Sequence, residues 1–386
     1  MLLRRNGGGD HGKMLSGEIV RFMWRRILRV ICLAVFFIPV GCRYIPNTDK
    51  YFTFPVTEIG LSEIKDTLLP RPICDSAWTY QAWYIDGDQG VFLSPLSLAQ
   101  SKFVTVSDIS SGTEYGRFCE IGRGPQDFLS PLASDYTNGY LSIFDLMTTR
   151  YSELDIESSV SQGRSIFVRN LPLDKSGKDY LSLFSIHRWK DSLLAYDMGQ
   201  NPASDDLYRM PDYVMYDVES GKKQKNLHLI QNSPLTNLKR ERDLVPVKGR
   251  LAATDFLDEA SNRLCFAMCF IPQLNIVNLE TGESRGFIVK DLKKTSLQNG
   301  FRHYHDIAAF RDRIYALYFG LEENKIFSGK AQTELHVFDW GGKMHARYII
   351  LDVVNGCQAS DRGLYVTLFS NNSYRLNLIP WDQLLD

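Results

Sequence analysis

Short apolar runs alternate with polar turns rich in Gly, Asn and Asp along most of the chain after residue 75. This pattern predicts β-hairpins, and no long stretch of that region repeats its apolar residues with the 3.6-residue period of a helix. Five predicted strands each follow such a turn, and their first apolar residues are separated by 52, 71, 50 and 50 positions. These residues are Leu141, Leu193, Leu264, Ile314 and Leu364. Self-similarity with a period near 50 residues indicates a repeat protein, with an insertion at the widest spacing.

An apolar pair followed by an acidic or amide residue recurs four times, as Ile143-Phe144-Asp145, Met215-Tyr216-Asp217, Ile276-Val277-Asn278 and Val337-Phe338-Asp339. The last three precede a turn and another strand-like run. One four-stranded propeller blade needs roughly 40–50 residues, so five repeats plus an N-terminal unit, from about residue 78 to 127, make six. We therefore predict an all-β fold, a six-bladed β-propeller of four-stranded antiparallel blades, over residues 76–386. A β-sandwich or two small β domains are the alternatives.

The first 42 residues have the composition of a targeting segment. A basic stretch from Met23 to Arg29 precedes an apolar run of 11 residues, Val30 to Val40. That run is too short to span a bilayer, which takes about 20 residues, but it suits the core of a signal peptide. The Gly41-Cys42 pair that follows resembles a bacterial lipobox, so we predict lipidation of Cys42 and translation from Met23. A plain secretory peptide with a buried Cys42 is the alternative, and residues 43–75 are predicted to be a tether or N-terminal extension.

Processing at Cys42 changes the charge of the protein. Residues 1–42 hold seven Lys or Arg and two Asp or Glu, which leaves 37 basic and 43 acidic residues and a net charge of −6. An acidic exported protein is a poor candidate for binding nucleic acid, and we predict none. Lipid chains would hold it to the membrane instead.

A second motif carries a resemblance to a known family. The segment Ile121-Gly122-Arg123-Gly124-Pro125-Gln126-Asp127-Phe128 resembles the Gly-Arg-Gly-Pro-Gly-Glu-Phe signature of the TolB-like six-bladed β-propeller lipoproteins common in Bacteroidetes. The turn Phe338-Asp339-Trp340-Gly341-Gly342-Lys343 is similar to a late turn of the same proteins. The resemblance implies the propeller fold and a lipid-anchored location in the cell envelope, at the outer membrane. It implies no general enzymatic activity.

The first of these motifs is expected to be a structural turn at a corner between blades. Gly122 and Gly124 can adopt positive φ and Pro125 fixes the exit, while Arg123 could pair with a carboxylate of the next blade. A ligand-binding role for Arg123 is the alternative.

Candidate chemistry is confined to the predicted mouth of the central channel. His303 and His305 stand at i and i+2 of a strand, which places both on one face and would allow zinc to bind. Asp306 follows them directly. The third ligand that zinc usually needs is not identifiable, so we predict a polar channel lining without a cofactor, with zinc or calcium as the alternative. Three further residues fall at comparable places in other repeats and are candidates for the same mouth: His187, Arg188 and Asp255.

Three classes of function remain open because propellers host all of them. The first is a membrane-anchored binding propeller, without enzymatic activity, for an envelope protein, a peptide or a glycan. The second is an exported enzyme, a lactonase-like hydrolase or a lyase, that uses a channel metal. The third is a structural subunit of an envelope assembly. The first is favoured because no catalytic motif is present and no catalytic residue can be named. The sequence leaves the side of the membrane and the ligand open.

Overall fold

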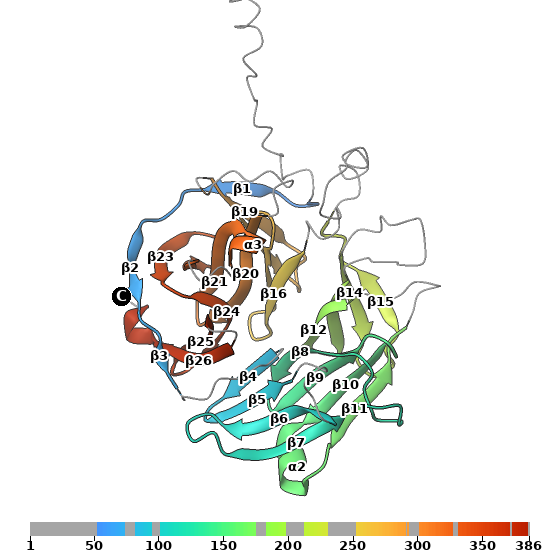
Figure 1. Ribbon diagram of the computed structural model, residues 1–386. Coiled ribbons are helices and arrows are strands. Elements are labelled where there is room, and N and C mark those ends of the chain that lie inside the picture. Colours follow the sequence, from blue (N-terminus) through green and yellow to red (C-terminus); the bar gives the residue numbers. More distant parts are fainter. Residues whose placement is uncertain are drawn as a thin grey trace, which may run out of the picture. The chain divides into compact units, whose positions relative to one another are not determined.

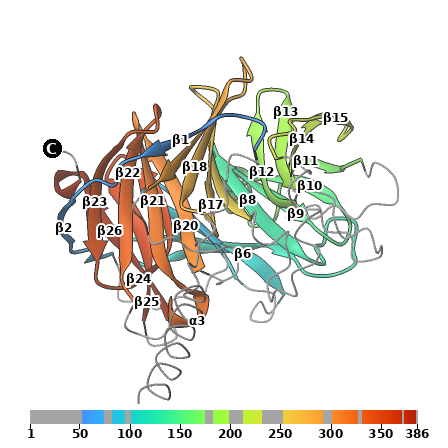
Figure 2. The same cartoon turned by 90° about the horizontal axis from the view of Figure 1, so that it is seen from above.

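Six β-sheets lie around a common axis in the computed structural model of the protein, and each extends outward from that axis (Figure 1 and Figure 2). The structure describes the ranges 52–73, 82–94, 101–174, 183–197, 212–230, 252–290, 292, 301–326, 331–370 and 373–384. All of these belong to one compact unit, residues 46–386. The predicted six-bladed β-propeller is confirmed, and we number the blades in the order of their innermost strands.

The strands of blades 1 and 2 are β4 (Ala82–Asp86), β5 (Gln89–Leu93), β6 (Lys102–Asp108), β7 (Glu114–Glu120), β8 (Pro131–Thr137), β9 (Tyr140–Asp145), β10 (Arg150–Asp155) and β11 (Phe167–Pro172). Those of blades 3 and 4 are β12 (Leu183–Trp189), β13 (Ser192–Asp197), β14 (Asp212–Asp217), β15 (Lys223–Asn226), β16 (Ala253–Asp258), β17 (Arg263–Met268), β18 (Gln273–Asn278) and β19 (Ser284–Val289). Those of blades 5 and 6 are β20 (Phe301–Phe310), β21 (Arg313–Glu322), β22 (Thr333–Asp339), β23 (Met344–Ile350), β24 (Val353–Ser360), β25 (Gly363–Ser370) and β26 (Ser373–Pro380). The described helices are α2 (Ile156–Gln162), α3 (Glu323–Ile326) and the 3-10 turn η4 (Trp381–Gln383), and three strands precede blade 1: β1 (Val56–Ile59), β2 (Ile64–Leu68) and β3 (Arg71–Pro72).

Position within a blade decides how polar a strand is. The second strands β13 and β17 are buried at every residue but the first, because a neighbouring blade packs against each face of the sheet. Strands buried on both faces read as continuous apolar runs. The outermost strand β15 has the sequence Lys-Gln-Lys-Asn and is buried nowhere along its length. The apolar runs that gave the repeat period are therefore the middle strands of the blades.

Hydrophobic contact between blades closes the ring. Each pair of neighbouring blades shares at least one cluster of buried apolar side chains, including the pair formed by blade 6 and blade 1. The cluster between blades 6 and 1 contains Ile85, Phe92 and Tyr365. Two hydrogen bonds reinforce it, since the Gln358 side chain accepts from the backbone N–H of Ile85 at 2.7 Å and donates to the Ile85 carbonyl at 2.9 Å.

Residues 52–73 belong to the propeller, which corrects the boundary that the sequence suggested at residue 76. Strand β1 pairs in parallel with β19 of blade 4, and β2 pairs in parallel with β23 of blade 5. Strand β3 then pairs with β26 and supplies the fourth strand of blade 6, whose other three strands come from the C-terminal end of the chain (Figure 1). These strands were missed because their side chains are mostly exposed and carry no apolar periodicity.

The structure confirms the strand positions of the five leading residues, whereas the motif of an apolar pair and an acidic or amide residue occupies two different strand positions. All five leading residues spaced by 52, 71, 50 and 50 lie in the second strands of blades 2 to 6, as the prediction requires. Asp217, Asn278 and Asp339 end third strands, and each side chain accepts backbone N–H groups of the following turn. Asp145 ends a second strand instead. In blade 1, the residue that ends the third strand and accepts from the following turn is Asp108. The motif alone was thus in error by one strand at its first occurrence.

The predicted signal segment, residues 1–42 with Cys42, lies outside the described residues. Within the described part of the chain, no helix is both long enough and apolar enough to span a membrane.

Candidate central-cavity binding site

The innermost strands of all six blades surround a central cavity of about 370 Å³. Its charged lining residues are Asp135, His187, Asp255 and Asp306, from four different blades. Aromatic side chains from blades 1, 2, 4 and 6 complete much of the wall: Trp83, Tyr84, Phe92, Tyr136, Phe256 and Tyr374. A concave site that combines apolar walls with a few convergent polar groups is the usual form of a ligand pocket.

An imidazole between two carboxylates joins blades 2, 3 and 4. His187 Nε2 lies 3.1 Å from Asp255 Oδ1, and His187 Nδ1 lies 3.5 Å from Asp135 Oδ2. The side chains of His187 and Asp255 are 8% and 4% exposed, whereas that of Asp135 is 22% exposed. Asp255 Oδ2 also accepts hydrogen bonds from the Ser185 hydroxyl at 2.6 Å and the Tyr213 hydroxyl at 2.8 Å. Every polar atom of this pair is therefore held in place.

This arrangement keeps His187 charged. Burial opposes the charge, but the negative charge of Asp255 and the hydrogen bonds that His187 donates to Asp135 and Asp255 outweigh it and raise the pKa of His187 to about 10. Burial likewise opposes ionisation of Asp255, and the His187 charge outweighs it, so the pKa of Asp255 lies below its ordinary value. At neutral pH the group is an imidazolium between two carboxylates and has no free lone pair to act as a base.

Asp306 lacks such a partner. Its Oδ2 accepts from the backbone N–H of Cys357 at 2.8 Å, and its Oδ1 accepts from the N–H of Ile307 at 3.0 Å and the Thr254 hydroxyl at 3.3 Å. No Lys, Arg or His of the described residues lies within ion-pair distance of this carboxylate. Burial raises the pKa of Asp306 to about 6 in spite of these hydrogen bonds.

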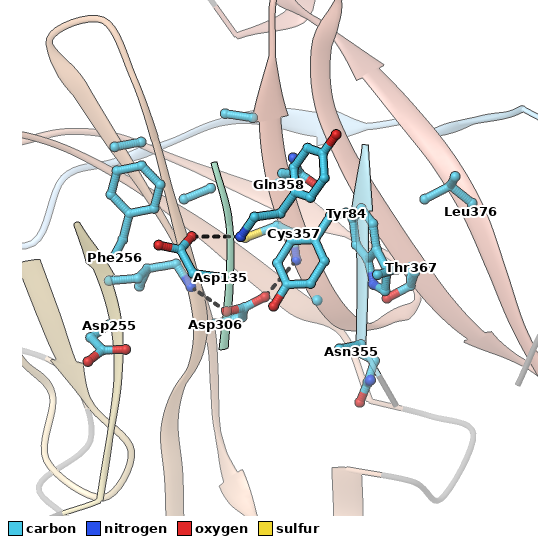
Figure 3. A pocket seen from close by; sticks show the side chains of 18 of the residues that line it. Tyr84, Asp135, Asp255, Phe256, Asp306, Asn355, Cys357, Gln358, Thr367 and Leu376 are labelled. Atoms are coloured by element: carbon cyan, nitrogen blue, oxygen red, sulfur yellow. Dashed lines mark hydrogen bonds between the residues drawn. The ribbon is translucent and has the colours of Figure 1, made fainter. Parts of the chain in front are cut away.

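Polar groups converge beside Asp306 at Gly356 of β24. A side chain at Gly356 would begin 3.3 Å from Asp306 Oδ2, 3.5 Å from Thr367 Oγ1 and 3.5 Å from Trp83 Nε1. Thr367 is 7% exposed, and its buried hydroxyl has no hydrogen-bond partner. Figure 3 shows Thr367, Tyr84 and Asp306 around the same space. Burial, followed by the charges of Asp135 and Asp306, raises the pKa of Tyr84, so its hydroxyl stays protonated.

The structure brings His187, Asp255 and Asp306 together at the cavity and separates the other predicted residues from it. His303 is fully buried, and its Nδ1 lies 3.3 Å from the Tyr318 hydroxyl. His305 lies 3.3 Å from Asn355 Oδ1, through Nε2, and packs on the Phe319 ring. Burial lowers the pKa of His303 to about 3 and that of His305 to about 4, with Arg302 adding to the second shift.

The expectation that both histidines share one face fails for a physical reason. Strand β20 carries two register shifts between Arg302 and Asp306, so its side chains do not alternate there as in a regular strand. Among the described residues, no group of three or more His, Cys, Asp or Glu could hold a metal ion. Arg188 does not line the cavity; its guanidinium lies 3.4 Å from the buried Glu153 carboxylate of β10 in blade 2, and its side chain is 40% exposed.

Asp135, Trp83, Tyr84 and Thr367 were not found from the sequence. Asp135 lies within β8, an innermost strand. A usable signal existed, since polar residues stand six to nine positions before the leading residue of the second strand in blades 2 to 5. Aligning the repeats on those leading residues would have placed Asp135 beside the other cavity residues.

The Gly-Arg-Gly-Pro segment forms a closed corner between β7 and β8, although not in the manner expected. Gly122 and Gly124 do not have positive φ; a Cβ on either would approach the Asp127 carboxylate closer than 3.0 Å. Asp127 Oδ2 accepts from the N–H of Gly124 at 2.7 Å, and Arg150 donates to the carbonyls of Pro125 and Asp127. The corner therefore depends on Asp127 and Arg150 rather than on Arg123, which is exposed.

The second motif lies at the outer part of blades 4 and 5. Trp340 and Gly341 line a smaller hollow of about 230 Å³ with residues of β17, β18 and β19. Gly342 has φ of +82°, and a Cβ there would overlap the Phe287 ring, so this turn requires glycine.

These features define a six-bladed propeller with a carboxylate-rich central cavity. No protein-family model matches the chain, and no curated protein sequence matches it. The fold is similar to that of a member of the DUF4221 family from Bacteroides vulgatus, with a TM-score of 0.57 and 12% identity over 82% of this chain and 96% of that chain. A candidate exported protein of Bacteroides fragilis gives a TM-score of 0.48 and 12% identity over 85% of this chain and 99% of that chain. BamB from Moraxella catarrhalis gives 0.35 and 10% identity over 76% and 82%. At such identities the likeness establishes the propeller fold alone.

Proposed function

We propose that this protein is an exported lipoprotein of the TolB-like type, which binds a ligand in its central cavity without transforming it. The observation that carries the proposal is the cavity itself, where four charged side chains from different blades surround one space together with aromatic walls. The Asp135–His187–Asp255 group favours binding over catalysis, because the imidazole lies between two carboxylates and is charged at neutral pH. Lipidation of Cys42 would hold the propeller in the cell envelope, at the outer membrane. The ligand would come from an envelope protein, a peptide or a glycan.

A pair of glycine variants tests the binding site without removing any charge. Gly356→Ala places a methyl group where Asp306, Thr367 and Trp83 converge, whereas Gly60→Ala has no atom within 4 Å of the added methyl group. We expect ligands found by thermal-shift screening of residues 43–386 to stabilise the wild type and Gly60→Ala. A ligand at 100 times its Kd adds about 2.7 kcal/mol. Gly356→Ala should lose that response, and an equal response in both variants would place the ligand elsewhere.

The anchoring part of the proposal has its own test. Cys42→Ala should leave the propeller in the soluble fraction of cells that export it, whereas the wild type should remain with membranes. Mass spectrometry of the N-terminal peptide should detect acyl chains on Cys42. An unmodified wild-type peptide would contradict lipid anchoring while leaving the cavity proposal intact.

One observation favours the enzyme alternative. The pKa of Asp306, raised to about 6 by burial in a cavity, is suited to a general acid or base near neutral pH. The two functions differ in what is recovered after incubation with the ligand. A binding protein returns the ligand unchanged, while new product in the wild type, absent in Asp306→Asn, would establish catalysis. Stoichiometric zinc that is lost in His305→Ala would support the channel-metal form of that alternative.

A further inference from the structure

The negative charge of the cavity wall exceeds its positive charge. Among the described residues, the lining holds three carboxylates, Asp135, Asp255 and Asp306, one imidazole, His187, and no Lys, Arg or Glu. With His187 protonated, the lining carries a net charge of −2. The excess is not spread evenly, because His187 lies against Asp135 and Asp255 and leaves Asp306 without a neighbouring cation.

Asp306 therefore carries a buried charge that the fold does not neutralise. Buried carboxylates are normally paired with a cation, and hydrogen bonds compensate only part of the lost hydration. Three donors reach the Asp306 carboxylate, namely the N–H groups of Cys357 and Ile307 and the hydroxyl of Thr254. All three donors are uncharged, so they orient the Asp306 carboxylate without neutralising its charge. A cation that enters the cavity can supply the missing positive charge.

An independent feature of the same place indicates a missing polar partner. The Thr367 hydroxyl is buried and makes no hydrogen bond, although buried polar groups usually have one. It converges with Asp306 Oδ2 and Trp83 Nε1 on the space beside Gly356. A hydroxyl can accept a hydrogen bond, so Thr367 and Asp306 together offer two acceptors to an N–H group placed between them.

Aromatic rings supply the remaining chemistry of the wall. Tyr84 and Tyr136 line the cavity and their rings stack with centroids 6.0 Å apart, whereas Trp83 presents its Nε1 edge to the space beside Gly356. A ring face attracts an ammonium or guanidinium group within about 6 Å, and more strongly when water is excluded. Carboxylate and aromatic groups together therefore suit an organic cation better than an anion or an apolar molecule.

We infer that the ligand is an organic cation, whose primary ammonium or guanidinium group binds between Asp306 and Thr367. The inference rests on the proposed function and gives its ligand a chemical class. The cation can belong to a small free amine or to a Lys side chain of a peptide, because both present the same group to this part of the wall.

Calorimetric titration of residues 43–386 with matched probes tests the inference. The cationic probes are n-butylammonium, n-butylguanidinium and lysine blocked at both ends. Their neutral counterparts are n-butanol and blocked norleucine, and glucose represents the glycan alternative. We expect the cations to bind and the neutral counterparts to bind at least tenfold more weakly. Binding of n-butylammonium without blocked lysine would identify a free amine as the source, and tighter binding of blocked lysine would identify a peptide.

Three variants separate the loss of a binding group from a loss of folding. Asp306→Asn should weaken cation binding roughly ten- to a hundredfold, as expected for loss of a charge-assisted hydrogen bond. Asp312→Asn, an exposed position in the turn that joins β20 to β21, should bind as the wild type does. Thr367→Val keeps the shape of the side chain and should weaken binding without unfolding the protein. Unchanged affinity in both Asp306→Asn and Thr367→Val would overturn the inference.

The pH dependence gives a further readout. The cations keep their charge below pH 9, and Asp306 becomes protonated as the pH falls through about 6. Affinity should therefore fall about tenfold between pH 7 and pH 5. Asp135 and Asp255 also face the site, but the pKa of Asp255 is lowered, so its charge persists over this range.

The outcomes distinguish the inference of a cationic ligand from the proposal that the cavity binds a ligand. If glucose or a neutral probe binds in the wild type and fails in Gly356→Ala, while the cations do not bind, the cation inference is wrong and the binding proposal stands. If no probe binds at concentrations up to about 10 mM, where an affinity near 1 mM would be evident, both are overturned.

Discussion

The His187 ion-pair group permits a quantitative prediction about stability. A pKa raised from 6.5 to about 10 corresponds to roughly 5 kcal/mol of stabilisation from the protonated form. Because the pKa is raised in the folded state, this contribution is complete below pH 6.5 and is lost as the pH rises through about 10. Replacement by glutamine removes the charge and leaves Asp255 buried without a cation. We expect His187→Gln to lower the free energy of unfolding by about 3–5 kcal/mol at pH 7.

The measurement is guanidinium unfolding followed by tryptophan fluorescence at pH 7 and again above pH 10. His187→Gln with Asp255→Asn should recover much of the loss at pH 7, because the asparagine amide can donate to the glutamine and still accept from Ser185 and Tyr213. His345→Gln is the matched control, since the His345–Asp339 pair is more than a quarter exposed and should contribute at most about 1 kcal/mol.

Two results would refute this reasoning. A loss below about 1 kcal/mol for His187→Gln at pH 7 would mean that the buried pair contributes little. An equal loss at pH 7 and above pH 10 would mean that the imidazole is not protonated in the folded protein. The second result would also remove the main structural objection to His187 as a catalytic base.

Four further predictions concern stability. Thr367→Val should raise the free energy of unfolding by about 1 kcal/mol, because it removes a buried hydroxyl without a partner, and a loss of stability in denaturant unfolding would show that the hydroxyl is bonded. Asp306 stabilises the folded protein fully below pH 3.8, and this contribution is lost through about pH 6. The stability of the wild type relative to Asp306→Asn should therefore fall by up to about 3 kcal/mol from pH 4 to pH 7, and a constant difference in unfolding experiments would contradict the raised pKa. Asp127→Ala should cost about 1–2 kcal/mol by thermal unfolding, since it leaves a loop N–H without its acceptor; no change would mean that Arg150 alone holds the corner. Phe52→Ala should cost about 3–5 kcal/mol, whereas a mere tether would tolerate the change at no cost in the same assay.

The propeller was predictable because its middle strands are buried on both faces. That burial forces long apolar runs into the sequence, and runs such as Leu264–Met268 recur once per blade. Residues 52–73 carry no such mark, since β1 and β2 add to the outer edges of blades through backbone hydrogen bonds. Backbone pairing leaves the side chains free, so the closure of blade 6 by β3 could not be deduced from periodicity.

The cavity was only partly predictable for a related reason. His187, Asp255 and Asp306 were found because they stand near the first strands of their repeats. Thr367 comes from β25, a second strand, and reaches the cavity only because the adjacent residue of β24 is Gly356. Thr367 reaches the cavity because Gly356, its partner in the next strand, has no side chain, and a single sequence does not show which residues are paired across strands.

The aspartates in turns stabilise the fold in their ionised form, whereas Asp306 does not. Hydrogen bonds from the Ser220 side chain and backbone hold the pKa of Asp217 below its ordinary value, so its ionised form stabilises the turn that follows β14. Asp306 has a raised pKa, so its ionised form costs stability at neutral pH. Thr367, its neighbour at Gly356, likewise adds an unpaired hydroxyl to a buried position. Residues that lower the stability of the folded protein are expected at functional sites, where a ligand supplies the missing interaction. Because the Asp306 carboxylate and the Thr367 hydroxyl, both unfavourable for stability, converge on one small space, the missing interaction is best supplied by a cation that also donates hydrogen bonds.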